Sequence, residues 1–151
     1  TPAKPVRLRN SYVIVPTSFE KDAEGNVVCV HADYLPETKS GTAGADSVKT
    51  KAAIHWLDAK TAVPAQFRMY DRLFTVPQPD SAEDFLDVLN RDSKFVSQGF
   101  VEPNVAAAAP ETRYQFERVG YFVTDIKDHS ADHPVLNLAV GLRDSWGKNA
   151  K

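Results

Sequence analysis

Several features that identify common classes of protein are missing from this sequence of 151 residues. No apolar run approaches the roughly 20 residues that a membrane-spanning helix needs, and the first residues lack the apolar segment of a secretory signal. The seven glycines are scattered and build no phosphate-binding loop. We therefore expect a cytoplasmic protein that makes no contact with a membrane.

Cysteine is almost absent as well. Cys29 is the single cysteine, so no internal disulfide can form. It lies in the apolar run Val27–Val30, where a small thiol packs well among hydrophobic neighbours. The sequence predicts a buried structural thiol here rather than a nucleophile.

A strong excess of positive charge is also missing. The chain has 18 Lys and Arg against 20 Asp and Glu, which gives a formal net charge of −2 and a pI near 6.0. A protein that binds nucleic acid without specificity is expected to be basic. Basic residues are nevertheless concentrated locally, because Lys4, Arg7 and Arg9 lie in the first ten residues with no acidic residue among them. Any contact with RNA must therefore be local.

Catalytic and metal-binding motifs are equally sparse. His129 and His133 flank Asp132 in a polar turn, but this segment supplies too few ligands for a metal site. A hydrolase triad of Ser130, His133 and Asp128 fails because these residues are nearly adjacent and no nucleophile elbow is present. We predict no catalytic residue, no metal and no cofactor in this chain.

Short β patterns run through most of the sequence, and 42% apolar residues suffice for a core. Leu8–Val15 and Val27–Tyr34 flank a turn-rich segment and predict a hairpin. Further strands are predicted at Ala52–Leu57, Gln66–Val76, Phe95–Val101, Thr112–Val119, Tyr121–Ile126 and Val135–Leu142. Short strands at this spacing indicate a mostly β chain of barrels or sandwiches.

One short helix is expected between the two halves of the chain. Pro77 and Pro79 form a stiff break, after which Ser81 can cap a helix that ends at Leu89. We place a domain boundary at Pro77, which gives a first domain over 1–76 and a second over 77–151.

Two short strings have the chemistry to read RNA bases. In Val6-Arg-Leu-Arg9 the period of two places both guanidinium groups on one strand face. In Gln115-Phe-Glu-Arg118 an amide that donates and accepts lies near a charged donor. A solvated strand face explains such arginines as well, and the nearby aromatic residues are more often core than stacking surfaces for bases. These aromatic residues are Tyr114, Phe116, Tyr121 and Phe122.

Several strings together match one family in the same order and at similar spacing. They are Val6-Arg-Leu-Arg-Asn-Ser-Tyr-Val-Ile14, Ile54-His-Trp56, Arg68-Met-Tyr-Asp-Arg-Leu-Phe74, Gln98-Gly-Phe-Val-Glu-Pro103, Gln115-Phe-Glu-Arg118, Gly120-Tyr-Phe122 and Val140-Gly-Leu-Arg-Asp144 with Trp146. Over nearly its whole length the chain resembles the C-terminal anticodon-binding region of the glutaminyl-tRNA synthetase family, a class I family.

The resemblance implies two small antiparallel β-barrels of the ribosomal protein L25-like, anticodon-binding type. Residues 1–76 would form the distal barrel, and 77–151 the short helix and the returning strands of the proximal barrel, whose early strands precede this chain. The parent enzyme would bind ATP with Mg²⁺ in a catalytic domain that this chain lacks. The implied partners are tRNA(Gln) and that catalytic domain, in a monomer.

The resemblance also implies roles for individual residues. Arg7 and Arg9 correspond to arginines at the pocket for the wobble base, and Gln115 and Arg118 to residues that contact the central anticodon base. Ser145 stands where related proteins often have threonine close to the tRNA. The pocket for the third base draws on a basic segment of which this chain keeps Lys4.

Three other interpretations stay open. The archaeal and eukaryotic type of glutamyl-tRNA synthetase has similar C-terminal barrels, although the strings Tyr70–Phe74 and Gln115–Arg118 favour the glutamine enzyme. The chain could instead be a protein-interaction barrel whose basic strands are merely solvated. A small hydrolase is a more distant alternative.

Overall fold

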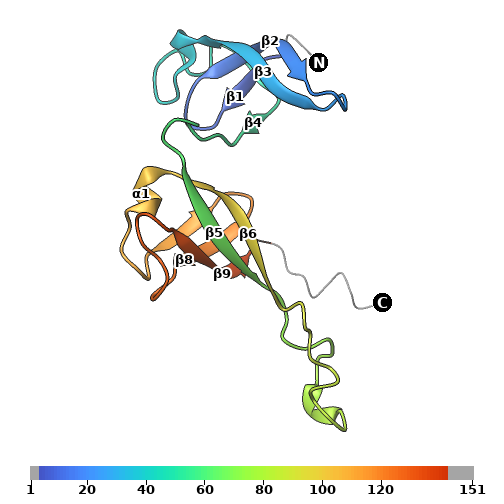
Figure 1. Cartoon of the computed structure of the whole chain (residues 1–151). Coiled ribbons are helices and arrows are strands. Elements are labelled where there is room, and N and C mark those ends of the chain that lie inside the picture. Colours follow the sequence, from blue (N-terminus) through green and yellow to red (C-terminus); the bar gives the residue numbers. More distant parts are fainter. Residues whose placement is uncertain (1–3, 143–151) are drawn as a thin grey trace. The chain divides into compact units, whose positions relative to one another are not determined.

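The computed structural model describes residues 4–142, and β-strands dominate this part of the chain (Figure 1). A single short α-helix, α1 (Pro103–Ala106), accompanies the strands together with two 3-10 helices, η1 (Pro36–Thr38) and η2 (Pro79–Ser81). The strands of the described residues are β1 (Val6–Leu8), β2 (Val13–Lys21), β3 (Val27–Leu35), β4 (Ala53–Ile54), β5 (Val63–Tyr70), β6 (Lys94–Val101), β7 (Arg113–Phe116), β8 (Gly120–Thr124) and β9 (Val135–Gly141). The prediction of a mostly β chain is confirmed.

The chain divides into two compact units, Thr1–Trp56 and Leu57–Lys151. We had expected the boundary at Pro77, but the division falls earlier, between Trp56 and Leu57. The reason is that β5 pairs with β6 and β9 and so belongs to the second unit. Closure of either unit into a barrel, and the naming of the units as distal and proximal, stay predictions.

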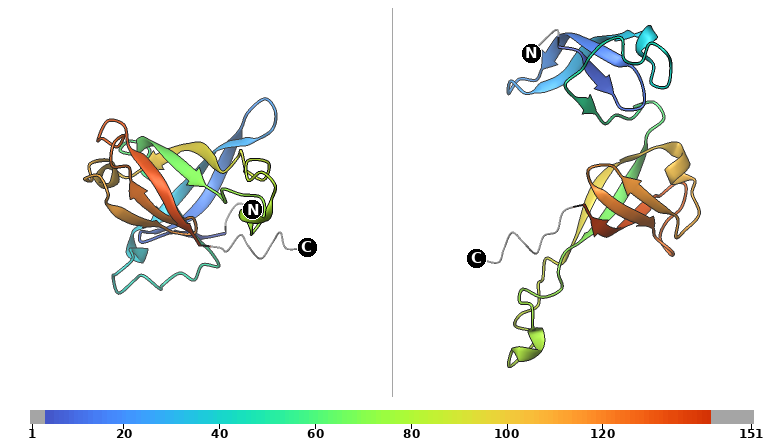
Figure 2. Two further views of the ribbon diagram at one scale, coloured as in Figure 1. Left: turned by 90° about the horizontal axis from the view of Figure 1, so that it is seen from below. Right: turned by 180° about the vertical axis from the view of Figure 1, so that it is seen from behind.

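The first unit is a four-stranded sheet with the order β3-β2-β1-β4. The predicted hairpin is confirmed as β2 and β3, which pair antiparallel from Val13 opposite Leu35 to Lys21 opposite Val27. Strand β1 accompanies β2 only at its beginning, where Arg7 lies opposite Val13. The remainder of β2 and β3 continues as a two-stranded ribbon with mostly exposed side chains (Figure 2).

This ribbon explains why the prediction of a buried Cys29 is wrong. Cys29 lies on β3 within the part that has no third strand beside it, and it is exposed. Val28 and Val30 on either side are exposed too. An apolar strand is buried only where another layer covers it, and the sequence alone does not reveal whether such a layer exists.

The buried interior of the first unit is small and includes one polar residue. Val13 and Thr38 are both fully buried. The Thr38 hydroxyl accepts a hydrogen bond from the backbone N–H of Val13 (2.9 Å) and donates one to the carbonyl oxygen of Leu35 (2.6 Å). This hydroxyl therefore ties the short helix η1 to the start of β2, and its burial costs little because both bonds are made.

The second unit is a five-stranded sheet with the order β6-β5-β9-β8-β7. Its core brings together residues from the sheet and from α1, which lies at one end of it (Figure 1). The buried members are Ala65, Val101, Val105, Ala106, Phe122 and Leu136. Strands β6 and β7 are the two edges of this sheet among the described residues.

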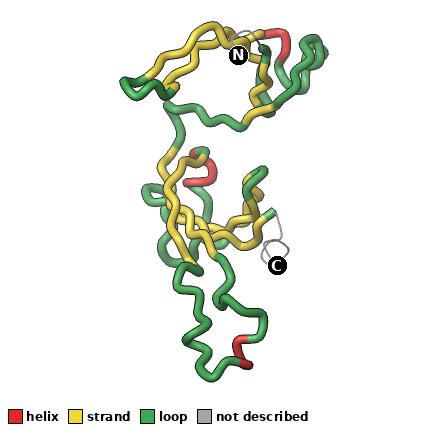
Figure 3. Tube along the Cα trace, turned by 90° about the vertical axis from the view of Figure 1, so that its right-hand side faces the viewer, coloured by secondary structure: helices red, strands yellow, loops and turns green. Residues whose placement is uncertain are grey.

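The predicted helix from Ser81 to Leu89 is wrong. The chain from 71 to 93 forms a long, largely irregular excursion between β5 and β6, with one isolated bridge between Phe74 and Leu89 (Figure 3). Phe85 and Leu86, which we expected on the buried face of this helix, are each 55% exposed. A helix this short needs packing to form, and the contact of Phe85 with the ring of Phe74 leaves most of this face in solvent. Within residues 4–142, no helix is long and apolar enough to cross a bilayer.

Candidate nucleic-acid interface

Arg7 is held by a loop that lies far from it in the sequence. It is half-buried on β1, and its guanidinium group donates to four oxygen atoms. Nη1 donates to the carbonyl oxygens of Thr38 (2.9 Å) and Ser11 (3.2 Å) and to the hydroxyl oxygen of Ser40 (3.4 Å), and Nη2 donates to the carbonyl oxygen of Ala45. Arg7 therefore fixes the loop that follows η1 against the β1–β2 turn.

Arg9 lies just beyond the end of β1, not within a strand as the sequence suggested. Strand β1 ends at Leu8, and Arg9 is the first residue of the following turn. Its backbone is fixed on both sides, because its N–H donates to the carbonyl oxygen of Ile54 (3.0 Å) and its carbonyl oxygen accepts from Trp56 Nε1 (3.0 Å). The exposed side chain of Arg9 is thus presented from a well-anchored turn.

Gln115 is presented by a regular strand. On β7 the side chains of Tyr114 and Phe116 pack against the core cluster of the second unit. Gln115 lies between them in sequence and is exposed, as the alternation of side chains along a strand requires. Tyr121 of β8 is its direct cross-strand partner and is also exposed.

Arg118 occupies the turn that joins β7 and β8. Its φ of 64° lies in the left-handed region, and the N–H of Val119 donates to the carbonyl oxygen of Phe116 (3.0 Å) to close the turn. Gly120 follows in a place where a Cβ atom would lie 2.7 Å from the carbonyl oxygen of Val140. The turn is therefore packed closely against β9, and Arg118 and Gln115 are held in one rigid hairpin.

Three aromatic rings support this hairpin from the core side. The ring of Phe116 makes edge-to-face contacts with Phe122 (5.0 Å between centroids) and with Phe67 of β5 (5.6 Å). Phe67 and Phe122 contact each other in the same way at 5.6 Å. Such pairs contribute about 0.5–1.5 kcal/mol each beyond the burial of their area. The hairpin that carries Gln115 and Arg118 is thus fixed on a packed aromatic cluster.

An apolar cavity of about 300 Å³ opens beside this cluster. Residues of β5, β6 and the β7–β8 hairpin line it, among them Phe67, Met69, Phe95, Gly99, Phe116 and Phe122. Phe95 and Phe100 on the edge strand β6 are more than half exposed. Exposed aromatic residues beside two sheet edges indicate a surface to which further chain can be added.

A network of polar and charged residues links β5, β9 and the segment that follows β8 in the second unit. Arg68 of β5 donates from Nη1 to Asp125 Oδ2 (2.9 Å) and from Nη2 to Asp128. The hydrogen bond with Asp128, and then the charges of Asp125 and Asp128, raise the pKa of the Arg68 guanidinium. Asp125 also accepts from Asn137 Nδ2 (2.7 Å) and from the N–H groups of Lys127 and Asp128. These donors, with Asn137 contributing most, lower the pKa of Asp125 to about 2 against the effect of burial. Both terminal nitrogen atoms of Arg68 therefore bond carboxylates of the same unit, which gives this residue a structural role.

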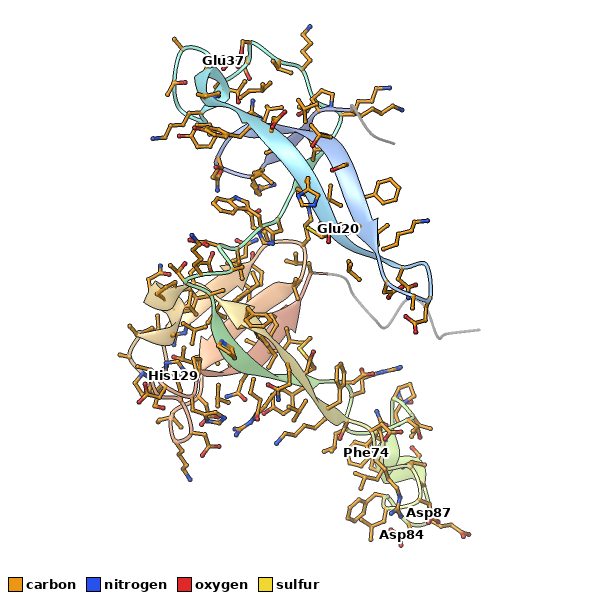
Figure 4. All side chains as sticks on the ribbon, turned by 45° about the horizontal axis from the view of Figure 1, so that its top comes forward. Glu20, Glu37, Phe74, Asp84, Asp87 and His129 are labelled. Atoms are coloured by element: carbon orange, nitrogen blue, oxygen red, sulfur yellow. The ribbon has the colours of Figure 1, made fainter. Side chains whose placement is uncertain are left out.

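The histidines considered as metal ligands are not brought together. His129 is buried (Figure 4), where its Nδ1 accepts from the N–H of Val135 (3.2 Å) and its Nε2 lies 3.1 Å from the carbonyl oxygen of Ala108. Both ring nitrogens therefore have structural partners within the protein. Asp132 and His133 lie in the exposed part of the same turn.

The structure thus places the predicted RNA-contacting residues in two separate pairs. Arg7 and Arg9 belong to the first unit, and Gln115 and Arg118 to the second. Ser145 lies outside the described residues. Tyr121 was considered in sequence and turned out exposed next to Gln115, whereas Phe122 is buried. The signal that separates them is the period of two along β8.

Comparison with known proteins indicates the family to which the chain is similar. Residues 53–125 match the model of the family described as "tRNA synthetases class I (E and Q), anti-codon binding domain". The chain is 57% identical over 148 residues to a glutamine–tRNA ligase of Ralstonia nicotianae. The aligned region covers 97% of the chain and 26% of that protein. Relatives with the same name from Cupriavidus necator and Vibrio parahaemolyticus are 57% and 54% identical over 97% and 96% of the chain.

The chain is thus similar to the anticodon-binding domain of class I tRNA synthetases over residues 53–125, and to glutamine–tRNA ligases over nearly its whole length. The curated relatives that match it over nearly its whole length are glutamine–tRNA ligases, and it spans about a quarter of their length. The resemblance seen in the sequence strings is confirmed.

Proposed function

We propose that this chain is the anticodon-reading region of a glutamine–tRNA ligase, which joins glutamine to tRNA(Gln) with ATP and Mg²⁺ in a separate catalytic domain. The observation that carries the proposal is the β7–β8 hairpin, which presents Gln115 and Arg118 from an aromatic core. Both residues lie within the segment that matches the anticodon-binding family. The similarity of nearly the whole chain to glutamine–tRNA ligases favours the glutamine enzyme over the glutamyl alternative.

The hairpin has the chemistry to read the central anticodon base. Anticodon bases are unpaired, so a protein can contact their Watson–Crick edges. The carboxamide of Gln115 can donate to one base atom and accept from another, while Arg118 supplies charged donors. A wrong base would leave one of these groups without its partner, at a cost of about 1–3 kcal/mol.

The first unit would contribute the reading of the wobble base through Arg7 and Arg9. Arg9 is exposed and anchored through its backbone, which suits a direct contact. Arg7 would have to exchange part of its carbonyl contacts for contacts to a base, so we assign it a combined role in loop structure and recognition. Ser145 completes the set of proposed tRNA contacts.

The cavity beside β6 and β7 fits the same proposal. In the proposed arrangement, early strands of the proximal barrel would lie beside the exposed edges and cover Phe95, which lines this cavity and is 56% exposed. The catalytic domain of the parent enzyme is the further partner that this assignment implies.

Titration with anticodon stem-loops tests the proposed function. The parent enzyme or the chain should bind a tRNA(Gln) stem-loop, with an affinity that falls as salt is raised because phosphate contacts release counterions. Equal or stronger binding of a tRNA(Glu) stem-loop would favour the glutamyl alternative. No affinity for either RNA would favour a protein-interaction barrel.

A further inference from the structure

Three side chains of different chemical type converge on the β2–β3 ribbon of the first unit. Glu20 of β2, which Figure 4 labels, lies directly opposite Cys29 of β3. His31 is two residues beyond Cys29 and therefore projects from the same face. One ligand atom from each of these three residues lies within 4.8 Å of the others.

The histidine ring is aimed at both of its neighbours. His31 Nε2 lies 2.6 Å from Glu20 Oε1 and 3.9 Å from Cys29 Sγ. One nitrogen atom thus faces a carboxylate oxygen and a sulfur atom at the same time. The register of the hairpin, which sets Cys29 opposite Glu20, brings the sulfur atom to the same nitrogen as the carboxylate oxygen.

The shape of the ribbon favours this convergence. The pairing of β2 with β3 is irregular between Pro16 and Ser18 and again between Glu20 and Lys21, so two irregularities bracket the cluster. Bulges of this kind re-aim side chains and occur more often next to functional sites. Lys21, the residue that follows Glu20 on β2, lies over the ring of Phe19 (5.6 Å), whose side chain projects from the other face.

We propose that Glu20, Cys29 and His31 form a binding site for a divalent cation of the zinc class. Thiolate, imidazole and carboxylate are the ligands of Zn²⁺, with bond lengths of about 2.0–2.3 Å, which place neighbouring ligand atoms roughly 3.3–3.7 Å apart in a tetrahedron. The sulfur–nitrogen distance of 3.9 Å must shorten by roughly 0.2–0.6 Å, and the Glu20 side chain must move outward by less than about 1 Å. Its side chain is 62% exposed, so nothing opposes this movement.

The bound ion would have a structural effect that the ribbon lacks otherwise. A two-stranded ribbon is only marginally stable in water. An ion held by one residue of β2 and two residues of β3 would cross-link the strands beyond the point where β1 supports them. A water molecule would take the fourth position, since the cluster is open to solvent.

Cobalt binding and thiol protection test this proposal in the 151-residue chain, where Cys29 is the only thiol. Addition of Co²⁺ should produce the near-ultraviolet absorption band of a thiolate–cobalt bond, at one ion per chain, and Zn²⁺ should displace it. Saturating Zn²⁺ should slow alkylation of Cys29 by iodoacetamide about tenfold or more, because the thiolate is the reactive species.

Variants distinguish a site formed by all three residues from metal binding by the Cys29 sulfur atom alone. Glu20→Gln and His31→Gln should each weaken Zn²⁺ binding at least about tenfold. His133→Gln, which changes another exposed histidine, should leave the affinity unchanged. Circular dichroism checks that each variant is folded, and the site should be lost when urea unfolds the chain.

Two results would overturn the proposal. One is a folded chain that shows no thiolate–cobalt band and the same alkylation rate with and without Zn²⁺. The other is a Zn²⁺ affinity that Glu20→Gln and His31→Gln leave unchanged. Neither result affects the proposed tRNA function, since none of these three residues is assigned to RNA.

Discussion

Gln115 of β7 and Tyr121 of β8 lie directly opposite each other in the antiparallel ladder, and both side chains are exposed. Tyr121 is 46% exposed although Phe122, the next residue, is buried. A polar group that can recognise the edge of a base and a ring that can stack on its face thus occupy one surface of the hairpin. Single-stranded nucleic acids are commonly bound by this combination.

Replacing Tyr121 with leucine should weaken stem-loop binding without unfolding the protein. Stacking of a base on an aromatic ring contributes about 1–3 kcal/mol, so the dissociation constant should rise about 5- to 150-fold. The free energy of unfolding should change little because the side chain is largely outside the core. Fluorescence anisotropy with a labelled stem-loop measures the first quantity and urea denaturation the second.

The matched control for this experiment is Tyr121→Phe. Phenylalanine keeps the ring and removes only the hydroxyl group, so it should retain most of the affinity. If leucine binds the stem-loop as tightly as tyrosine does, stacking at this position has no part in recognition.

Substitution of the two N-terminal arginines by lysine should separate structure from recognition. Arg7→Lys keeps the charge but cannot reproduce the contacts of two guanidinium nitrogens with Thr38 and Ala45. We expect the first unit to lose about 1–3 kcal/mol of stability from buried carbonyl groups that lose their donor. Arg9→Lys should leave stability within about 0.5 kcal/mol, since the Arg9 side chain is exposed.

Thermal or urea unfolding of the two lysine variants measures this difference. Equal stabilities of the Arg7 and Arg9 variants would contradict the structural role of Arg7. A loss of RNA affinity in the Arg9 variant at unchanged stability would support its proposed contact with the wobble base.

Acid should destabilise the second unit through Asp125. Hydrogen bonds and Arg68 lower its pKa to about 2 in the folded protein, against an ordinary value of 3.8. The folded state therefore favours the ionised form, and the resulting stability is present above about pH 4 and lost as pH falls through 2. Allowing for solvent screening, we expect on the order of 1–2 kcal/mol from this group.

Asp125→Asn tests this assignment, because an amide would turn donors toward the donors that surround the carboxylate. The variant should be less stable by about 1–3 kcal/mol at pH 7, and its stability should fall less between pH 4 and pH 2. Asp132→Asn, in the exposed turn nearby, serves as the control. The account would be wrong if both variants showed the acid sensitivity of the parent.

The strands could be predicted from sequence because their apolar residues alternate and turn residues separate them. The boundaries shifted at β5, which begins at Val63 and ends at Tyr70 although the apolar pattern continues to Val76. Residues beyond Tyr70 enter the excursion between β5 and β6, where pairing is reduced to the bridge at Phe74. Propensity cannot foresee where a partner strand ends.

The helix at Ser81 failed for a related reason. The local sequence favours a helix, because Ser81 can cap it and the apolar residues have helical spacing. In the structure, however, Asp84 Oδ1 accepts from the N–H of Leu86 in a tight turn. The ring of Phe85 meets that of Phe74 (6.5 Å between centroids) but stays 55% exposed. Tertiary packing, which local signals cannot supply, decides whether so short a helix forms.

The candidate site was predictable in its residue types and less so in their surroundings. The exposure of Gln115 followed from the alternation along β7, whereas Arg118, expected within a strand over Thr112–Val119, lies in the turn after β7. The contacts of Arg7 depend on residues 38–45, a loop of no regular pattern, and had no signal in the local sequence. The convergence of Glu20 on Cys29 and His31 depends on the register of the hairpin, although the spacing of Cys29 and His31 on one strand face was visible.

The most direct test of the account combines a change of the central anticodon base with Arg118→Asn, a residue that tolerates the left-handed backbone at this position. For the parent protein, changing the central base should weaken stem-loop binding about 5- to 150-fold, equivalent to 1–3 kcal/mol. In the Arg118→Asn variant most of this discrimination should disappear, while Arg91→Asn, which removes an exposed charge elsewhere in the same unit, should retain it. If Arg118→Asn discriminates against the changed base as strongly as the parent does, the hairpin does not read that base.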